Sequence, residues 1–413
     1  MTDTDGILDE ALDRLHRAGP ERRGWLSNHG PMAVEALVRG GHGPSVHRWL
    51  DYYRDKLEDM PSPYARVTGD NWREALGDPR RVADWTAYFT RELADHPWRE
   101  VLAAWWPRLL PGIAGGATHP VIRVGHAVRT LLADPGDAAA GAAGPRTAEL
   151  AHALGYWGAR HLPLPPLGSM PGPAPASAAG ALAAVPRVAD QNGGVRDRLA
   201  RIGALPQWPG ARTAPGARGA PGPDEARDLL AELVRAAVRR YATHGHGDPI
   251  MLVHTATAPN AVLRTLPALP RELWAPSLDA AWRASAAITA GYSPEAALPV
   301  DRLPSIAPLL SAAPPAEASG TAGAPPGPAA LFPEVFARAA AHGDEHAIKF
   351  TDTALDVAAA EAARAAAADS GTDAEGRTGP GPRGAADDTA AGGRDHRALA
   401  AALRACDLID PAL

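Results

Sequence analysis

Lysine and cysteine are almost absent from this sequence, and their scarcity narrows the possible functions. Among 413 residues with 41 Lys+Arg, only Lys56 and Lys349 are lysine. The single cysteine, Cys406, excludes an internal disulfide and a cysteine-based zinc site, and it fits a reducing compartment. The formal net charge is −6, so the sequence lacks the positive excess that nucleic acids and anionic membranes attract. We therefore expect no nucleic-acid partner.

Long apolar runs are missing as well. No stretch approaches the roughly 18 uninterrupted apolar residues of a membrane-spanning helix. The N-terminal segment Met1–Asp5 is acidic and contains no apolar core of the kind that a secretory signal requires. We therefore expect no membrane span and a cytoplasmic location.

Fingerprints of common catalytic folds are also missing. The only G-x-G-x-x-G pattern, at Gly379, Gly381 and Gly384, lies in a low-complexity run with no strand before it. The sequence contains no P-loop motif, no G-x-S-x-G elbow and no H-E-x-x-H pair. These absences argue against a Rossmann nucleotide site, a P-loop NTPase, an α/β-hydrolase and a zincin-type protease.

What the sequence does contain is a series of helical patterns. Apolar residues recur every three or four positions, as on one face of a helix. Strands alternating with helices are missing, and no repeat marks a solenoid. We therefore predict an all-α fold, a single large helical domain with long low-complexity loops. The predicted helical segments are 7–15, 31–37, 46–57, 82–110 with a break near His96-Pro97, 118–132, 147–161, 224–241, a helix from 248, 276–292, 331–341, 344–355 and a short terminal helix.

Glycine and proline, 42 of each, are concentrated in the connections between these segments. Such stretches bury too little apolar surface to offset the entropy lost on ordering. We predict a helical domain at 1–369 with disordered insertions at 163–223 and 311–328. A low-complexity linker at 370–395 and a terminal helix at 396–413 follow it.

Several of the 15 histidines lie where helices are expected to begin. His29 and His119 stand just before prolines that suit a first helical turn. The positive end of the helix dipole disfavours imidazolium there, and a metal ligand must be a neutral imidazole. His254 lies about one turn into another predicted helix, and His346 lies in the first turn of a further one. No short spacing assembles these histidines into one site, and a single histidine of this kind is more often a structural residue.

Lys349 lies in a segment with a strong helix start. Asp344 is suited to cap this helix, which puts His346 and Lys349 on one helical face. One interpretation pairs Lys349 with Glu345 one turn back, a contact worth roughly 0.2–0.5 kcal/mol. The other is that lysine is retained because arginine cannot lose its proton and act as a neutral amine. The residues alone leave both interpretations open.

Five segments carry a resemblance that spacing rules do not detect. They are Asn28–Leu37, Thr118–Arg123, His152–Trp157, His254–Ala258 and Asp344–Lys349. In order and spacing they resemble the questin oxidase-like family. Members of this family open oxygenated aromatic rings, typically anthraquinones and related polyketides, by Baeyer–Villiger-type or dioxygenase chemistry, often with NADPH. The resemblance implies an oxygenase whose partners are a small aromatic substrate and O₂.

The resemblance also implies a mononuclear non-heme iron, Fe(2+), held by histidines and a carboxylated lysine. Carboxylation needs a neutral amine, which burial supplies by lowering the pKa of a lysine. Because His126 follows His119 by seven residues, it is an alternative to that ligand. By position the ligands are His29, His119, His254, His346 and Lys349.

Two other functions fit the same residues. One is a metal-dependent hydrolase with a carboxylated lysine, although the lack of strands argues against it. The other is a catalytically inactive helical protein that binds a small molecule or a partner. Arg123 is a further candidate, to hold a phenolate or carboxylate of the substrate. The sequence leaves the substrate, the direct role of NADPH and the oligomeric state open.

Overall fold

Helices make up nearly all of the regular structure. The computed structural model describes residues 3–133, 144–209, 220–299, 302–303, 328–371 and 396–412. Within these ranges the only strands form two short pairs, antiparallel β1 (Glu21–Arg22) with β2 (Leu26–Ser27) and parallel β3 (Gly168–Ser169) with β4 (Ala204–Leu205). The all-α prediction is confirmed.

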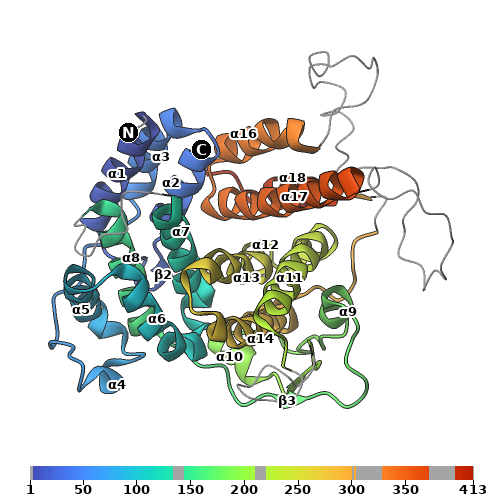
Figure 1. The fold of residues 1–413 in the computed structure, drawn as a ribbon, viewed down its shortest axis with the longest axis horizontal. Helices are drawn as coiled ribbons and strands as arrows, with labels where there is room; N and C mark the ends of the chain where they lie inside the picture. Colours follow the sequence, from blue (N-terminus) through green and yellow to red (C-terminus); the bar gives the residue numbers. More distant parts are fainter. Residues whose placement is uncertain are drawn as a thin grey trace.

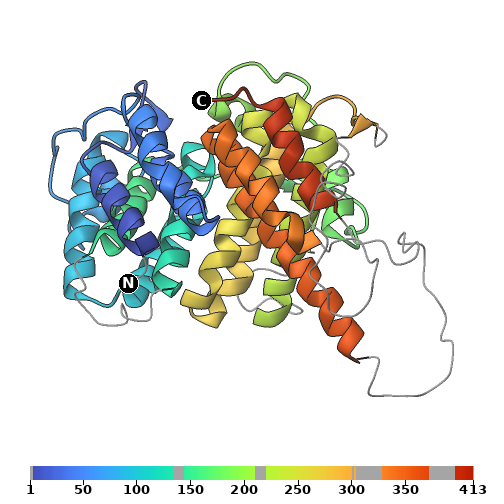
Figure 2. The ribbon, with the colours of Figure 1, turned by 90° about the horizontal axis from the view of Figure 1, so that it is seen from above.

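The helices form two groups that lie side by side (Figures 1 and 2). The first group contains α1 (Asp3–His16), α2 (Gly30–Arg39), η1 (Gly43–Ser45), α3 (Val46–Arg54), α4 (Trp72–Ala75), η2 (Pro79–Arg81), α5 (Val82–Asp95), α6 (Trp98–Leu109), η3 (Leu110–Gly112), η4 (Gly115–Thr118), α7 (His119–Ala133) and α8 (Pro145–Arg160). The second contains α9 (Ala178–Ala183), α10 (Val195–Ala200), α11 (Pro223–His244), η5 (Gly245–Gly247), α12 (Pro249–Leu252), α13 (His254–Thr265), η6 (Leu266–Ala268), η7 (Arg271–Leu273), α14 (Trp274–Tyr292), η9 (Pro328–Leu331), α16 (Phe332–His342), α17 (Glu345–Gly371) and α18 (Arg397–Leu408).

The tryptophans of the first group pack the core. Trp85 and Phe89 lie one turn apart on α5 and stack at 5.7 Å between ring centroids. Trp105 of α6 meets both rings edge-on, at 5.5 and 5.0 Å. Such edge-to-face pairs add about 0.5–1.5 kcal/mol to the gain from burying each ring. The break predicted near His96-Pro97 separates α5 from α6, so these rings pack between two helices.

Residues 163–209 belong to the folded structure, which corrects the predicted disordered insertion at 163–223 for this part of it. The segment contains two short helices and several buried side chains, among them Leu199 and Trp208. Trp208 packs edge-on against Trp282 of α14, at 5.4 Å between ring centroids. A few well-placed apolar side chains are enough to order the segment, although its average composition is poor in them.

The remaining predicted insertions fall mostly on residues that are not described. Residues 210–219, 311–327 and 372–395 lie outside the described ranges. The terminal helix predicted at 396–413 is present as α18, which packs against α11, α16 and α17. The division of the chain into domains stays a prediction.

Four helices join the two groups in a closed ring of neighbours. Helix α7 packs against α2 and α13, and α17 packs against the same two helices. The crossing of α7 and α13 is especially close, since a Cβ at Gly125 would lie 2.5 Å from Cβ of Ala261. None of the described helices combines the length and apolar character needed to cross a membrane. The ring of α2, α7, α13 and α17 carries the candidate site.

Candidate metal centre

Four histidines, one from each helix of the ring, meet in the interior of the molecule. His29 precedes α2, His119 opens α7, His254 opens α13 and His346 is the second residue of α17. Nε2 of His119 lies 2.7 Å from Nε2 of His29 and 3.0 Å from Nε2 of His254. The rings of His346 and His29 are 4.5 Å apart between centroids. All four side chains are buried. Residues from four distant parts of the sequence thus form one buried cluster.

Lys349 lies beside this cluster, one turn along α17 from His346. Its side chain is fully buried, and its Nζ has no hydrogen-bond partner among the described residues. Burial lowers the pKa of Lys349 to about 7, although the carboxylates of Glu345 and Asp344 oppose the shift. A substantial fraction of the side chain is therefore the neutral amine at neutral pH.

The predicted pairing of Lys349 with Glu345 gives way to a different ion pair. Glu345 is buried and pairs with Arg22, which comes from the β1–β2 hairpin. Its Oε1 also lies 3.8 Å from Nδ1 of His29. Because Arg22 takes this carboxylate, the described residues form no ion pair between Glu345 and Lys349.

A strained turn fixes the orientation of His119. Gly116, Ala117 and Thr118 have φ values of 52°, 53° and 70°, in the left-handed region that alanine and threonine rarely adopt. This turn brings the carbonyl oxygen of Gly116 to 2.6 Å from Nδ1 of His119. A nitrogen facing a carbonyl must donate its proton, so Nε2 of His119 presents its lone pair to the other histidines.

Carboxylates face the outer edges of two other rings. Nδ1 of His346 lies 3.4 Å from Oδ1 of Asp344, the residue that caps α17. That Oδ1 also accepts from the backbone N–H groups of His346 and Ala347, at 2.8 and 3.2 Å, as predicted for a cap. Together with Glu345 near His29, these oxygens favour a proton on Nδ1 and leave Nε2 free to bind.

The cluster is built to remain neutral. Burial lowers the pKa values of His29, His119 and His254 well below the ordinary value, and the nearby Lys349 charge lowers them further. The first turns of α2, α7 and α17 point their backbone N–H groups toward this region, which disfavours additional positive charge on the rings. Neutral imidazoles are the form that binds metals.

Protein groups alone do not satisfy this arrangement. Nε2 of His119 has one lone pair, so it cannot accept a full hydrogen bond from both His29 and His254. Two nitrogens that each lie about 2.1 Å from one ion, at a right angle, are about 3.0 Å apart, close to the observed 2.7 and 3.0 Å. The donor atoms of His29, His119 and His346 all lie within 4.8 Å of one another. The donor set therefore fits a transition metal that prefers imidazole.

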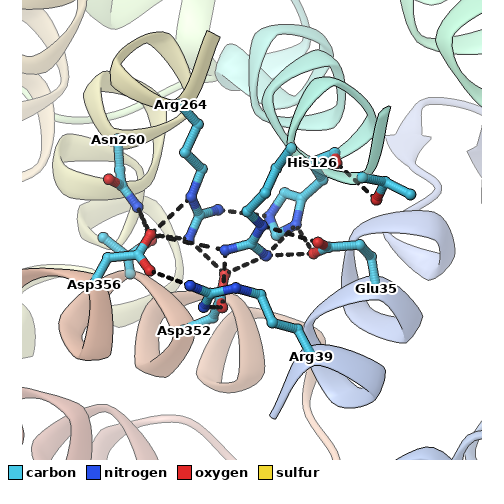
Figure 3. A network of polar contacts seen from close by, with 10 residues as sticks. Glu35, Arg39, His126, Asn260, Arg264, Asp352 and Asp356 are labelled. Carbon is cyan, nitrogen blue, oxygen red and sulfur yellow. Dashed lines mark hydrogen bonds and ion pairs between the residues drawn. The ribbon is translucent and has the colours of Figure 1, made fainter. Parts of the chain in front are cut away.

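The structure places His119 with the other histidines and His126 elsewhere. Nδ1 of His126 lies 2.6 Å from Oε2 of Glu35, in a separate network of charged residues (Figure 3). Arg123 is also used elsewhere, because its Nε and Nη2 donate to Glu149 at 2.6 and 2.8 Å. This ion pair leaves Arg123 unsuited to anchor a substrate.

Sequence reasoning missed the residues that orient the ligands. Gly116, Arg22 and Tyr53, whose hydroxyl accepts from the backbone N–H of His29 at 2.7 Å, had not been singled out. The Gly115-Gly116 pair just before a helix-opening histidine was the one available signal, since glycine tolerates a left-handed turn.

A family model described as questin oxidase-like matches residues 26–136. No curated protein matches the chain. The matched range is well under half of the chain, and it contains His29 and His119 but not the ligand candidates from α13 and α17. The match confirms the family resemblance of the motifs over this range and supports an oxidase-type activity, hence an oxidoreductase with a small-molecule substrate.

Proposed function

We propose that this protein is an oxygenase of aromatic polyketides that works at a mononuclear non-heme iron. The iron is bound by His29, His119, His254, His346 and a carboxylated Lys349. The substrate is a hydroxylated, anthraquinone-like ring, which undergoes oxygen-dependent cleavage or Baeyer–Villiger-type oxygen insertion. One observation carries the proposal: four buried histidines meet beside a buried lysine amine for which the described part of the chain offers no hydrogen-bond partner.

The chemistry of Lys349 supports the carboxylated form. A neutral amine attacks CO₂ through its lone pair and loses a proton, which gives a carbamate with one negative charge. A pKa of about 7 makes the neutral amine available without a separate base. The carbamate is then the one anionic oxygen ligand among neutral imidazoles, a mixed N/O set suited to iron.

The residues around the site prepare it for this chemistry. When bound, ferrous iron supplies the one-electron steps that let O₂ react with an aromatic ring. The carbonyl of Gly116 holds the Nδ1 proton of His119, and Asp344 and Glu345 face the corresponding edges of His346 and His29. Burial of the cluster excludes bulk water, and the helix N-termini favour a substrate ionised at a phenol.

The role of NADPH depends on the fate of the oxygen atoms. Insertion of one atom leaves the other to be reduced to water, which requires two electrons and two protons; NADPH supplies a hydride and solvent the second proton. Ring cleavage that retains both atoms needs no external reductant. We propose NADPH as a reductant from solution and place the protein in the cytoplasm, where Cys406 stays reduced.

Metal content and isotope labelling test the proposal together. Protein purified without added metal should contain iron as its main transition metal, near one equivalent per chain. With ¹⁸O₂ and a hydroxylated anthraquinone or its reduced form, the product should carry label, and the NADPH consumed distinguishes insertion from cleavage. Label from water alone would favour the hydrolase, and protein with neither iron nor turnover would favour the inactive binding protein.

A further inference from the structure

A network of buried and partly buried polar side chains, most of them charged, lies further along the same four helices (Figure 3). Its members are Glu35 and Arg39 of α2, His126 and Arg129 of α7, Asn260 and Arg264 of α13, and Asp352 and Asp356 of α17. Every helix that carries a candidate ligand at its start therefore contributes to the network as well.

The spacing along the chain repeats in all four helices. The candidate ligand and a charged member of the network are ten positions apart in each: His29 and Arg39, His119 and Arg129, His254 and Arg264, His346 and Asp356. Within one helix, the members of the network follow the candidate ligand by six to ten positions. This separation corresponds to about 9–15 Å along the helix axis. The network thus ties the helices together two to three turns beyond the histidines.

Asp352 is the centre of the network. Its carboxylate accepts from one arginine of each other helix in the ring: Arg39 at 3.2 Å, Arg129 at 2.9 Å and Arg264 at 2.6 Å. Asp352 is buried, and these arginines hold its pKa well below the ordinary value, although burial alone would raise it. One carboxylate on α17 therefore fixes the positions of α2, α7 and α13.

The network is closed to a metal ion. Donor atoms of Glu35, His126 and Asp352 lie within 4.8 Å of one another, a spacing that a cation could use. However, Glu35 already accepts from both Arg129 and His126, and three guanidinium groups surround the three carboxylates. Adding a cation would place it against the positive charge of these arginines, so the role of the network must be different.

We propose that Asp352 is a positioning residue for the metal site, acting through the three arginines that set the relative positions of the four helix starts. The inference rests on the proposed metal-binding function. Burying each ion costs desolvation energy, so a small net gain in stability is expected from the network, and we assign it the role of fixing the geometry of the four helices. A shift of one helix by a fraction of an ångström changes the distances between the Nε2 atoms, and metal affinity depends on them.

The test compares two isosteric changes in equally buried carboxylates. Asp352→Asn removes the central charge of the network. Glu149→Gln removes the charge of a separate cluster, where Glu149 of α8 pairs with Arg123 and His16. Both variants lose paired carboxylates, but Glu149 contacts only one helix of the ring, through Arg123 of α7, and its loss leaves the connections among the four ligand-bearing helices in place. The probe is Co²⁺ added to metal-free protein, and its binding is measured from the visible absorption spectrum. Unfolding of the metal-free protein in urea is measured in parallel.

Asp352→Asn should weaken Co²⁺ binding by about tenfold or more and alter the spectrum. Glu149→Gln should unfold at lower urea and yet bind Co²⁺ with wild-type affinity and spectrum. Arg39→Gln, which removes a half-exposed arm of the network and should leave the fold intact, is expected to weaken binding by about twofold.

Two results overturn the inference alone: wild-type Co²⁺ affinity and spectrum in Asp352→Asn and Arg39→Gln, or equal losses of affinity in Asp352→Asn and Glu149→Gln. If wild-type protein binds neither iron nor Co²⁺, the proposed function fails and the inference fails with it.

Discussion

The histidine cluster and the Asp352 network are built from the same four helices, yet they differ in how their polar groups are satisfied. In the network, each carboxylate accepts from at least two donors. In the cluster, Nζ of Lys349 has no hydrogen-bond partner among the described residues, and the single lone pair of His119 Nε2 faces two other imidazole nitrogens. Asp352 and Glu35 of the network are as deeply buried as Lys349 and the histidines of the cluster, so exposure of these groups to water does not explain the difference.

An unsatisfied buried polar group costs about 1–3 kcal/mol, and native structures contain few of them. In the network, the same helices provide arginine partners for buried carboxylates. These helices can therefore pair buried charges at positions where no ligand is bound. The unpaired amine and the competing histidine nitrogens at the helix starts therefore indicate a bound component that the chain itself does not supply. A metal ion would satisfy the Nε2 lone pairs of the histidines, and carboxylation would turn the lone amine into a ligand.

The largest expected effect comes from removing one histidine of the cluster. His254→Ala should lower iron affinity by about 100-fold or more, because it deletes a proposed ligand rather than a supporting group. His29→Ala and His346→Ala should behave alike. The measurement is iron per chain after purification and dialysis. Full iron occupancy in one of these variants would remove that residue from the ligand set.

The matched control is His152→Gln. His152 is a partly buried histidine, stacked on His16 at 4.4 Å between ring centroids, and desolvation lowers its pKa to about 3. It lies outside both the cluster and the network. Iron content should stay at the wild-type level, which separates loss of a ligand from general damage by histidine replacement.

Replacing Lys349 tests the anionic ligand, with the next largest effect. Lys349→Arg should lose iron and turnover, because guanidinium stays protonated, cannot form a carbamate and places a cation beside the metal. Lys349→Glu should retain some iron, since a carboxylate supplies an anionic oxygen. Wild-type iron and turnover in Lys349→Arg would exclude the lysine from the site and weaken the family-based assignment.

The stability of metal-free protein offers a third test that needs no iron. Lys349 has a pKa of about 7 in the fold against an ordinary value of 10.5. Between these pH values the unfolded chain binds a proton that the native state does not, so the unfolding free energy should rise with pH, by up to about 1.4 kcal/mol per pH unit.

Lys349→Met should remove this dependence. At pH 7 the variant should be more stable than wild type by about 1–4 kcal/mol, because methionine is buried without desolvating an amine. The difference should shrink toward pH 10.5. The network gives a slope of the same sign in a lower pH range, because the pKa of Glu35 is lowered from 4.5 to about 2 by Arg129 and His126, against the effect of burial. Its stabilisation should therefore be lost as pH falls from 4.5 to 2. The urea midpoint of unfolding, measured across pH, checks both expectations. Equal pH profiles for wild type and Lys349→Met would contradict the assignment of Lys349.

The helices were predictable from the sequence because their apolar residues recur with a helical period and their ends carry prolines and caps. Residues 163–209 were mispredicted because average composition hid a few decisive side chains such as Trp208. The Lys349–Glu345 pair was a sound local inference that failed for a non-local reason, since Arg22 approaches from a hairpin more than 300 residues away in the sequence.

The candidate ligands came from family motifs and not from spacing. His29 and His119 are 90 residues apart, and nothing local indicates that their Nε2 atoms meet. The ten-residue spacing between ligand and network residue was present in the sequence, but it becomes visible only once the ligands are named. The left-handed turn at Gly116 likewise depends on tertiary packing, which holds Ala117 and Thr118 in strained conformations.

A smaller effect than the loss of a ligand is expected at the contact between the helices that carry His119 and His254. Gly125 of α7 lies against Ala261 of α13, and an added Cβ would be 2.5 Å from Cβ and 2.8 Å from the carbonyl oxygen of Ala261. Gly125→Ala must therefore push the two helices apart. Because this displaces Nε2 of His119 from Nε2 of His254, Co²⁺ affinity should fall by about tenfold.

A second tight helix crossing provides the control. An added Cβ at Gly155 of α8 would lie 2.8 Å from the backbone nitrogen of Thr86 in α5, a contact as close to main-chain atoms as the first. Both substitutions should destabilise the metal-free protein by about 1–3 kcal/mol through overpacking. Only Gly125→Ala acts on two helices that carry candidate ligands, so only it should weaken Co²⁺ binding. Equal losses of Co²⁺ affinity in the two variants would mean that metal affinity follows overall stability. The difference between the histidine cluster and the Asp352 network would then say nothing about metal binding.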